Sequence, residues 1–233
     1  MATLVLVPGA GSDSWYWHRV VPLLEADGHE VVAVDLPCDD DAADLRTYTG
    51  VIVDAIAARV GTGDVVLVAQ SMGALSAPLV CEHLPVALIL LVAAMSPIPG
   101  EPPGAWWDAV GQPDAARAFA VEQGRDPDDD DPVTVFLHDV PDEVAAASAD
   151  HLRPQSGTPF AAPWPAAAWP AVPTRFLLCT EDRLFPPALQ RRIVPERLGI
   201  VPDELTSGHL PALAHPDELV DWVRGCLADL ERP

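Results

Sequence analysis

A serine at the end of an apolar run is the first residue of this chain that could carry chemistry. Ser71 stands in the string Ala69-Gln70-Ser71-Met72-Gly73, directly after the strand-like run 65–68. Small residues two positions before and two positions after a serine let the chain turn sharply from a strand into a helix, which exposes the hydroxyl group above the sheet. The usual motif has glycine at both positions, and here the first is Ala69. The motif alone also fits a helix cap followed by a packing glycine.

An acid and a histidine follow two later strand-like runs. Asp182 comes after the run 174–179, and His209 comes after a short run at about 203–205. Because the carboxyl ends of parallel strands meet at one edge of a sheet, we expect these side chains to lie close to Ser71. A histidine can take the proton of a serine hydroxyl and return it to a leaving group, and an aspartate holds the imidazole in the required tautomer. The order Ser, Asp, His is that of the α/β-hydrolases rather than that of chymotrypsin or subtilisin.

Two of these roles have competing candidates nearby in the sequence. Glu181 adjoins Asp182 and is an alternative acid. His215 is close to His209, but it precedes a proline and is typical of a region that caps a helix.

The glycine-rich turn after the first strand-like run is a candidate for stabilising negative charge. The oxyanion of a tetrahedral intermediate needs two fixed N–H donors. The amide of Met72 follows the serine at a helix start, and the turn 8–12 can aim the amide of Ala10 at the same point. The turn fits a dinucleotide-binding fingerprint poorly, because Ser14 stands where the third glycine would be.

Strand-like and helix-like segments alternate along most of the chain. Near-continuous apolar strands separated by helices are typical of a parallel sheet that is covered on both faces. We therefore predict the α/β class, and the order Ser, Asp, His further indicates an α/β-hydrolase fold with about six mostly parallel strands, helices on both faces and an inserted cap. The expected strands are 3–7, 30–35, 65–69, 88–93, 174–179 and about 203–205, and the expected helices are 15–27, 45–60 (ended by Gly61), 72–84, 187–196 and 216–230.

The stretch 97–173 interrupts this alternation. It is rich in proline, alanine and tryptophan, and it is too long to be a plain loop. We predict a cap over the carboxyl ends of the strands, inserted into a core made of residues 1–96 and 174–233. Helical pieces are expected at 106–110, 114–123 and 142–149. More than half of its large aromatic residues are expected to pack the cap onto the core rather than line a pocket; these residues are Trp106, Trp107, Phe119, Phe136, Phe160, Trp164 and Trp169.

The amino-acid composition limits the kinds of molecule that this chain is expected to bind. The formal net charge is −22 and every basic residue is an arginine, which argues against nucleic acid and anionic membranes as partners. The four cysteines fit no metal-binding spacing, and at least three lie in strand-like or helix-like apolar runs, so we predict reduced thiols and a cytoplasmic location. The chemistry expected of Ser71, His209 and Asp182 implies no metal and no cofactor. No apolar run reaches the length of a membrane span. Five acids in the six positions 126–131 lack the spacing of a calcium loop and indicate a solvated loop. The oligomeric state stays open, with a homodimer as one candidate.

Motifs over nearly all of the chain outside 97–173 resemble the plant methylesterase and hydroxynitrile lyase branch of the α/β-hydrolases, and bacterial hydrolases share them. The motifs are Gly9-Ala10 with Trp15-Tyr16-Trp17, Val21-Pro22-Leu23-Leu24, Asp35-Leu36-Pro37, Cys179-Thr180-Glu181-Asp182 with Gln190, and Gly208-His209 with Leu213, Pro216 and Leu219. The resemblance implies Ser71 as nucleophile, Asp182 as acid and His209 as base. It also implies that the amides of Ala10 and Met72 form the oxyanion hole.

The chain departs from that family at several positions. Pro8 replaces a histidine before the first glycine, and Gly208 replaces an acid before the catalytic histidine. The lyase members carry a lysine directly after the histidine and a threonine in the oxyanion turn, where this chain has Leu210 and Gly9. Without that lysine nothing obvious stabilises a leaving cyanide, so the esterase branch is favoured. The residues expected to line a substrate pocket are Gly9, Trp15, Trp106, Trp107 and Leu210.

We interpret the chain as a serine hydrolase that cleaves a small, largely apolar carboxylic ester through an acyl-enzyme. The same triad serves lactonases, thioesterases and C–C hydrolases, and these remain alternatives. A ligand-binding protein with a vestigial triad is an alternative from another class. The negative net charge favours neutral substrates, unless an arginine such as Arg183 reaches the mouth of the site.

Overall fold

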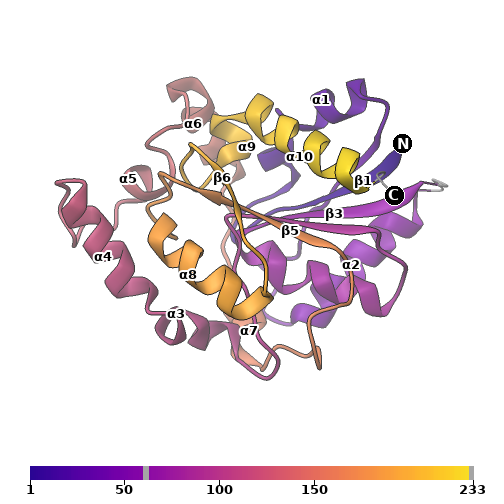
Figure 1. The fold of residues 1–233 in the computed structure, drawn as a ribbon, viewed down its shortest axis with the longest axis horizontal. Helices are drawn as coiled ribbons and strands as arrows, with labels where there is room; N and C mark the ends of the chain where they lie inside the picture. Colours follow the sequence, from indigo (N-terminus) through magenta and orange to yellow (C-terminus); the bar gives the residue numbers. More distant parts are fainter. Residues whose placement is uncertain (60–62, 231–233) are drawn as a thin grey trace.

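Six parallel strands form one sheet in the computed structural model, which describes residues 1–59 and 63–230 (Figure 1). Their spatial order is β2-β1-β3-β4-β5-β6, and every neighbouring pair is parallel. The strands Ala2–Val7 and Leu88–Val92 consist of Val, Leu, Ile and Ala apart from Thr3 and are buried on both faces, as expected where helices cover both sides of the sheet. The predicted α/β-hydrolase sheet is confirmed. The strands are β1 (Ala2–Val7), β2 (Glu30–Ala33), β3 (Asp64–Gln70), β4 (Leu88–Val92), β5 (Thr174–Cys179) and β6 (Asp203–Leu205).

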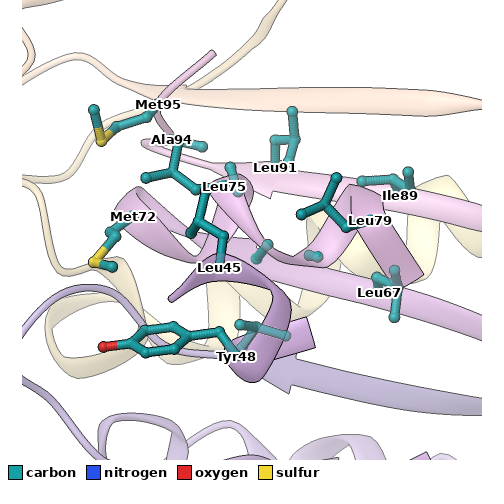
Figure 2. Packing of buried hydrophobic residues seen from close by; sticks show 14 of the residues in the cluster. Leu45, Tyr48, Leu67, Met72, Leu75, Leu79, Ile89, Leu91, Ala94 and Met95 are labelled. Carbon is teal, nitrogen blue, oxygen red and sulfur yellow. The ribbon is translucent and has the colours of Figure 1, made fainter. Parts of the chain in front are cut away.

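Helices cover both faces of the sheet, as Figure 1 shows. One face packs against α2 (Leu45–Ala57), two 3₁₀ helices after β3, and α8 (Pro187–Leu198). The other face packs against α1 (Val21–Ala26) and α10 (Pro216–Leu230), with the short α9 (Pro211–Ala214) before α10. Figure 2 shows the first of these two cores, in which Met72 and Leu75 lie near Tyr48 of α2. The residues after β3 are therefore packed on their core side.

Proline explains why two expected helices are divided. The expected helix 15–27 consists of the 3₁₀ helix η1 (Ser14–Trp17) and α1, with Pro22 in the first turn of α1. The expected helix 72–84 consists of η2 (Ser71–Leu75) and η3 (Ala77–Glu82), with Pro78 at the start of η3. Proline has no N–H to give to a preceding turn, so each break falls just before it. The expected end of the helix 45–60 at Gly61 lies outside the described residues.

Residues 97–173 contain helices and no strand, and the structure describes this whole stretch. Three helices coincide with the expected pieces, whereas α5 and α7 are four or five residues long and too short to give a periodic pattern. The buried ion pair between Arg197 of α8 and Glu101 ties the start of the stretch to the core. The elements are η4 (Pro103–Ala105), α3 (Trp106–Ala109), α4 (Gln112–Glu122), α5 (Pro132–Phe136), α6 (Asp142–Ser148), η5 (Ala149–His151) and α7 (Thr158–Ala161).

Two kinds of special feature are absent from residues 1–59 and 63–230. No helix there is long and apolar enough to cross a membrane. No group of three or more His, Cys, Asp or Glu side chains in the same part of the chain is arranged to hold a metal ion. The acidic stretch 126–131 is an exposed loop before α5, and Asp131 caps that helix by accepting from the amide of Val133 at 2.9 Å.

We expect Gly73→Ala to destabilise the fold. A Cβ atom at this position would lie 2.8 Å from the Pro8 carbonyl oxygen and 2.9 Å from that of Val7, so the end of β1 or the turn after β3 must shift. Overpacking of this kind costs about 1–3 kcal/mol in the free energy of unfolding. The matched control is Gly50→Ala in α2, where a Cβ meets nothing within 4 Å and should stabilise by about 0.5–1 kcal/mol. Urea unfolding measures both; equal stabilisation by the two variants would contradict the expected clash.

Candidate active site

Ser71 sits in a sharp turn at the end of β3. Its backbone has φ 51°, a left-handed value that is unusual for a residue with a side chain. The Ser71 carbonyl accepts from the amide of Met95 at 3.1 Å, which fixes the turn to the segment after β4. The close approach of Gly73 to β1 lets the chain leave the strand at this angle. The turn therefore holds the Ser71 hydroxyl at the edge of the sheet.

Three side chains form a buried hydrogen-bonded chain at that edge. The Ser71 Oγ lies 3.1 Å from His209 Nε2, and His209 Nδ1 lies 2.8 Å from Asp182 Oδ2. The exposed fraction is 8% for Ser71, 2% for His209 and 0% for Asp182. With its Nδ1–H donated to the carboxylate, the imidazole presents a free lone pair at Nε2 to the serine hydroxyl. This arrangement can take the proton of Ser71.

Backbone amides hold the acid in place. Asp182 Oδ1 accepts from the amides of Leu184 and Phe185 at 2.9 and 2.8 Å, which leaves Oδ2 facing His209. Glu181 is exposed and contacts the neighbouring loop through its backbone, whose amide donates to the Ser207 carbonyl. A carboxylate that accepts several amide bonds keeps its orientation. The structure thus pairs the imidazole with Asp182 and directs Glu181 elsewhere.

The alternative base lies outside this chain of hydrogen bonds. His215 Nε2 is 3.6 Å from Asp139 Oδ2, and its Nδ1 is 4.0 Å from Glu218. It stands directly before α10, as its sequence context indicates.

Sequence reasoning missed the residues that hold the His209 ring and backbone. Phe185 and Phe136 contact the ring edge to face, with centroids 5.1 and 5.6 Å away. Gln70 Nε2 donates to the His209 carbonyl at 3.1 Å. Gln70 lies inside the serine motif itself, so its position was visible in the sequence, but its partner 139 residues away was not.

The glycine-rich turn after β1 meets Ser71 at the same cavity, which Ala10 and Met72 both line. The amide of Gly11 donates to Gln155 Oε1 at 3.1 Å, and the Gly11 carbonyl accepts from the amide of Arg153 at 3.0 Å. Gln155 donates in turn to the hydroxyl of Tyr48 at 3.2 Å. Residues 153–155 therefore tie down the turn that carries the Ala10 amide.

A cavity of about 520 Å³ opens onto the Ser71 hydroxyl and the His209 ring. This volume lies in the range of small-molecule sites. Four of the five predicted pocket residues line it: Gly9, Trp15, Trp107 and Leu210. Its further large apolar lining residues are Tyr16, Met95, Phe136, Leu137, Leu152, Phe160, Leu184 and Leu213.

The prediction for Trp106 is wrong, because this side chain is fully buried and does not line the cavity. Its indole N–H donates to the Ser96 carbonyl at 3.3 Å, and its ring packs against Phe185 at 5.1 Å. The ring therefore supports a residue that contacts His209. A buried indole needs a partner for its N–H, and the backbone here supplies one in the core.

Charged and thiol groups take little part in the cavity. Arg153 is the arginine among its lining residues in the described part of the chain, and its guanidinium donates to the Leu36 carbonyl and to Asp39. Arg183, the arginine considered for the mouth of the site, is not among the lining residues, and its guanidinium donates to the Thr134 carbonyl at 2.7 Å. Burial raises the pKa of the Cys179 thiol well above its usual value, which keeps this thiol protonated.

Comparison with protein families gives one match that spans most of the chain. The sequence profile described as "Alpha/beta hydrolase family" matches residues 4–222.

Individual relatives have low sequence identity to this chain, and their names differ from one another. Norfluorocurarine synthase 1 from Strychnos sp is 27% identical over 97% of this chain and 94% of its own length. Methylesterase 7 from Arabidopsis thaliana is 35% identical over 50% of this chain and 54% of its own length. The crystal structure of a pyrethroid hydrolase from Sphingobium faniae JZ-2 superposes with a TM-score of 0.80 at 26% identity, covering 98% of this chain and 97% of that one. The likeness to plant methylesterases and bacterial hydrolases expected from the motifs is confirmed.

Proposed function

The chain belongs to the α/β hydrolase family, and on that premise we propose that it is a serine hydrolase that cleaves a small, largely apolar carboxylic ester through an acyl-enzyme. The observation that carries the proposal is the hydrogen-bonded chain from Ser71 through His209 to Asp182, which opens into an apolar cavity. The names of relatives, a methylesterase and a pyrethroid hydrolase, support the ester class.

In the proposed reaction Ser71 Oγ attacks the ester carbonyl while His209 Nε2, at 3.1 Å, takes its proton. Asp182 stabilises the imidazolium that forms, through the 2.8 Å bond to Nδ1. The amides of Ala10 and Met72 are the proposed donors to the oxyanion. The C–O bond of the ester then breaks, and His209 returns the proton to the departing alcohol. Water attacks the acyl-enzyme by the same steps and releases the acid.

We further propose that residues 97–173 act as a cap on a core formed by 1–96 and 174–233. Trp107, Phe136, Leu152 and Phe160 of this stretch line the cavity opposite residues of the core. Walls of this kind favour burial of an apolar acyl or alcohol group, at roughly 25 cal/mol for each Å² removed from water. The substrate choice is thus assigned to the cap and the chemistry to the core.

The nucleophile is tested by Ser71→Ala. Because the variant keeps the cavity and loses the attacking oxygen, kcat for short p-nitrophenyl esters should fall by roughly 10³-fold or more. A fluorophosphonate should label the wild type at Ser71 and leave the variant unlabelled. Ser76→Ala is the control, since its hydroxyl donates to the Gly73 carbonyl away from the cavity. Unlabelled wild type that binds esters without turnover would instead indicate a ligand-binding protein.

The acid is tested by comparing Asp182→Asn with Glu181→Gln. An asparagine can still accept from Leu184 and Phe185, but its amide then faces His209 Nδ1 and favours the wrong tautomer. We expect kcat to fall roughly 10³-fold for Asp182→Asn. Glu181→Gln should stay within about twofold, because this side chain is exposed. The reverse ranking would refute the assignment of the acid.

Substrate charge is tested with two esters of similar length, p-nitrophenyl butyrate and the monoanionic p-nitrophenyl succinate. Of the described residues that line the cavity, Arg153 is the one arginine, and its guanidinium already donates to the Leu36 carbonyl and to Asp39. We expect kcat/KM to be at least about tenfold higher for the neutral ester, since an unpaired charge in an apolar site is costly. The difference should persist at high salt, where long-range repulsion is screened. A preference for the anion would contradict the neutral class.

A further inference from the structure

Another largely enclosed carboxylate, that of Asp139, contacts the loop that carries His209. Asp139 lies between α5 and α6, and its side chain is 10% exposed. Its Oδ2 accepts from the Gly208 amide at 2.6 Å and from the Ser207 hydroxyl at 3.2 Å. These are the two residues that directly precede His209. A residue of the stretch 97–173 therefore holds the backbone next to the imidazole.

Gly208 is the residue type that this contact requires. A Cβ atom at position 208 would lie 2.5 Å from Asp139 Oδ1 and 2.8 Å from His138 Nε2. Any side chain at 208 would therefore displace the Asp139 carboxylate. Position 208 lacks the acid that the resembled family often has before its histidine. In this chain Asp139, 69 residues earlier, places a carboxylate next to position 208.

The close hydrogen-bond partners of the Asp139 carboxylate are the Gly208 amide and the Ser207 hydroxyl. His215 Nε2 is 3.6 Å from Oδ2, beyond a normal hydrogen bond. Burial lowers the pKa of His138, although the neighbouring Asp139 carboxylate opposes this shift. Within the described residues, neither His138 Nε2 nor Asp139 Oδ1 has a hydrogen-bond partner. The negative charge is thus directed mainly at the Gly208 amide and the Ser207 hydroxyl.

We propose that Asp139 is a positioning residue that fixes the Ser207–Gly208 backbone and so aims the His209 ring at Ser71. Gln70 holds the carbonyl on the other side of the same histidine, at 3.1 Å. The two contacts hold the backbone on both sides of the His209 side chain, an arrangement that we call a clamp. Displacement of a reacting group by about 1 Å can cost about 10²-fold in rate, so a clamp of this kind acts on kcat. The inference rests on the proposed function, in which His209 is the base.

The test compares Asp139→Ala with the conservative Asp139→Asn. Alanine removes the acceptor, and kcat for a p-nitrophenyl ester should fall about 10–100-fold, with KM within about threefold. Asparagine keeps an acceptor oxygen for the Gly208 amide and should retain kcat within about fivefold. Asp142→Ala, an exposed acid at the start of α6, is the matched control and should leave kcat unchanged. Rates are normalised to the sites titrated by fluorophosphonate, which removes losses due to misfolded protein.

A rescue experiment separates positioning from general stability. Gly208→Asp alone should lower kcat through the clash, whereas Asp139→Ala combined with Gly208→Asp should recover at least about fivefold over Asp139→Ala, because the carboxylate returns to the vacated space. A normalised kcat for Asp139→Ala within twofold of the wild type would overturn the proposal. So would equal losses for the alanine and asparagine variants, or a double variant no better than Asp139→Ala.

The two proposals can fail separately. If the wild type is neither labelled nor active, the serine hydrolase function fails. The downfield proton resonance of the His209 Nδ1–H, assigned by its loss in His209→Gln, still reports the ring position in that case. It should persist in Asp139→Asn and broaden or disappear in Asp139→Ala. Persistence in both variants would overturn the positioning role independently of turnover.

Discussion

The left-handed backbone of Ser71 places the hydroxyl group that the rest of the site surrounds. A residue with a side chain gives up about 1–3 kcal/mol in this region of φ and ψ, so the surrounding structure must enforce it. β3 lies in the middle of the sheet between β1 and β4, and the turn is further held by the Met95 amide and by Gly73 against β1. The strain is therefore supported by the most buried part of the fold, which keeps the hydroxyl in one position.

Such a fixed hydroxyl is useful only if the imidazole is equally fixed, and the polar groups around it are arranged accordingly. Asp182 gives one oxygen to two amides and the other to His209. Gln70 extends from the serine turn itself to the His209 carbonyl, so the proposed nucleophile and the proposed base are held by the same residue. In a site that excludes water, a fully partnered network of this kind is rigid, whereas one missing partner is costly. Correct geometry and stability therefore depend on the same bonds.

Sequence reasoning located the parts of this site that follow strands. Ser71 stands directly after a strand, and Asp182 and His209 follow the ends of two later strands within four residues, so that parallel pairing brings the three positions together. Trp106 and Asp139 gave no comparable signal, because they lie in short helices or loops where burial depends on distant partners. The prolines that divide the expected helices 15–27 and 72–84 are visible in the sequence, and each one ends the preceding turn even though the apolar pattern continues past it. The contacts between the stretch 97–173 and the core could not be predicted from the sequence either, because they too join residues that are far apart in the chain.

The stretch 97–173 both lines the cavity and holds other parts of the site in place. Its side chains Trp107, Phe136 and Phe160 line the cavity, while Gln155 and the Arg153 amide hold the turn that carries the Ala10 amide. Phe136 also contacts the His209 ring, so one of the residues that line the cavity is in direct contact with the proposed base. Changes that reshape the cavity for another substrate therefore reach the catalytic geometry unless they avoid the tethered segments. Trp107 contacts Phe185 with ring centroids 5.7 Å apart, and Phe185 in turn contacts His209. Phe160, for which the described part of the chain shows no ring contact of this kind, is therefore a position where the shape of the cavity can change with little effect on the alignment of Ser71 and His209.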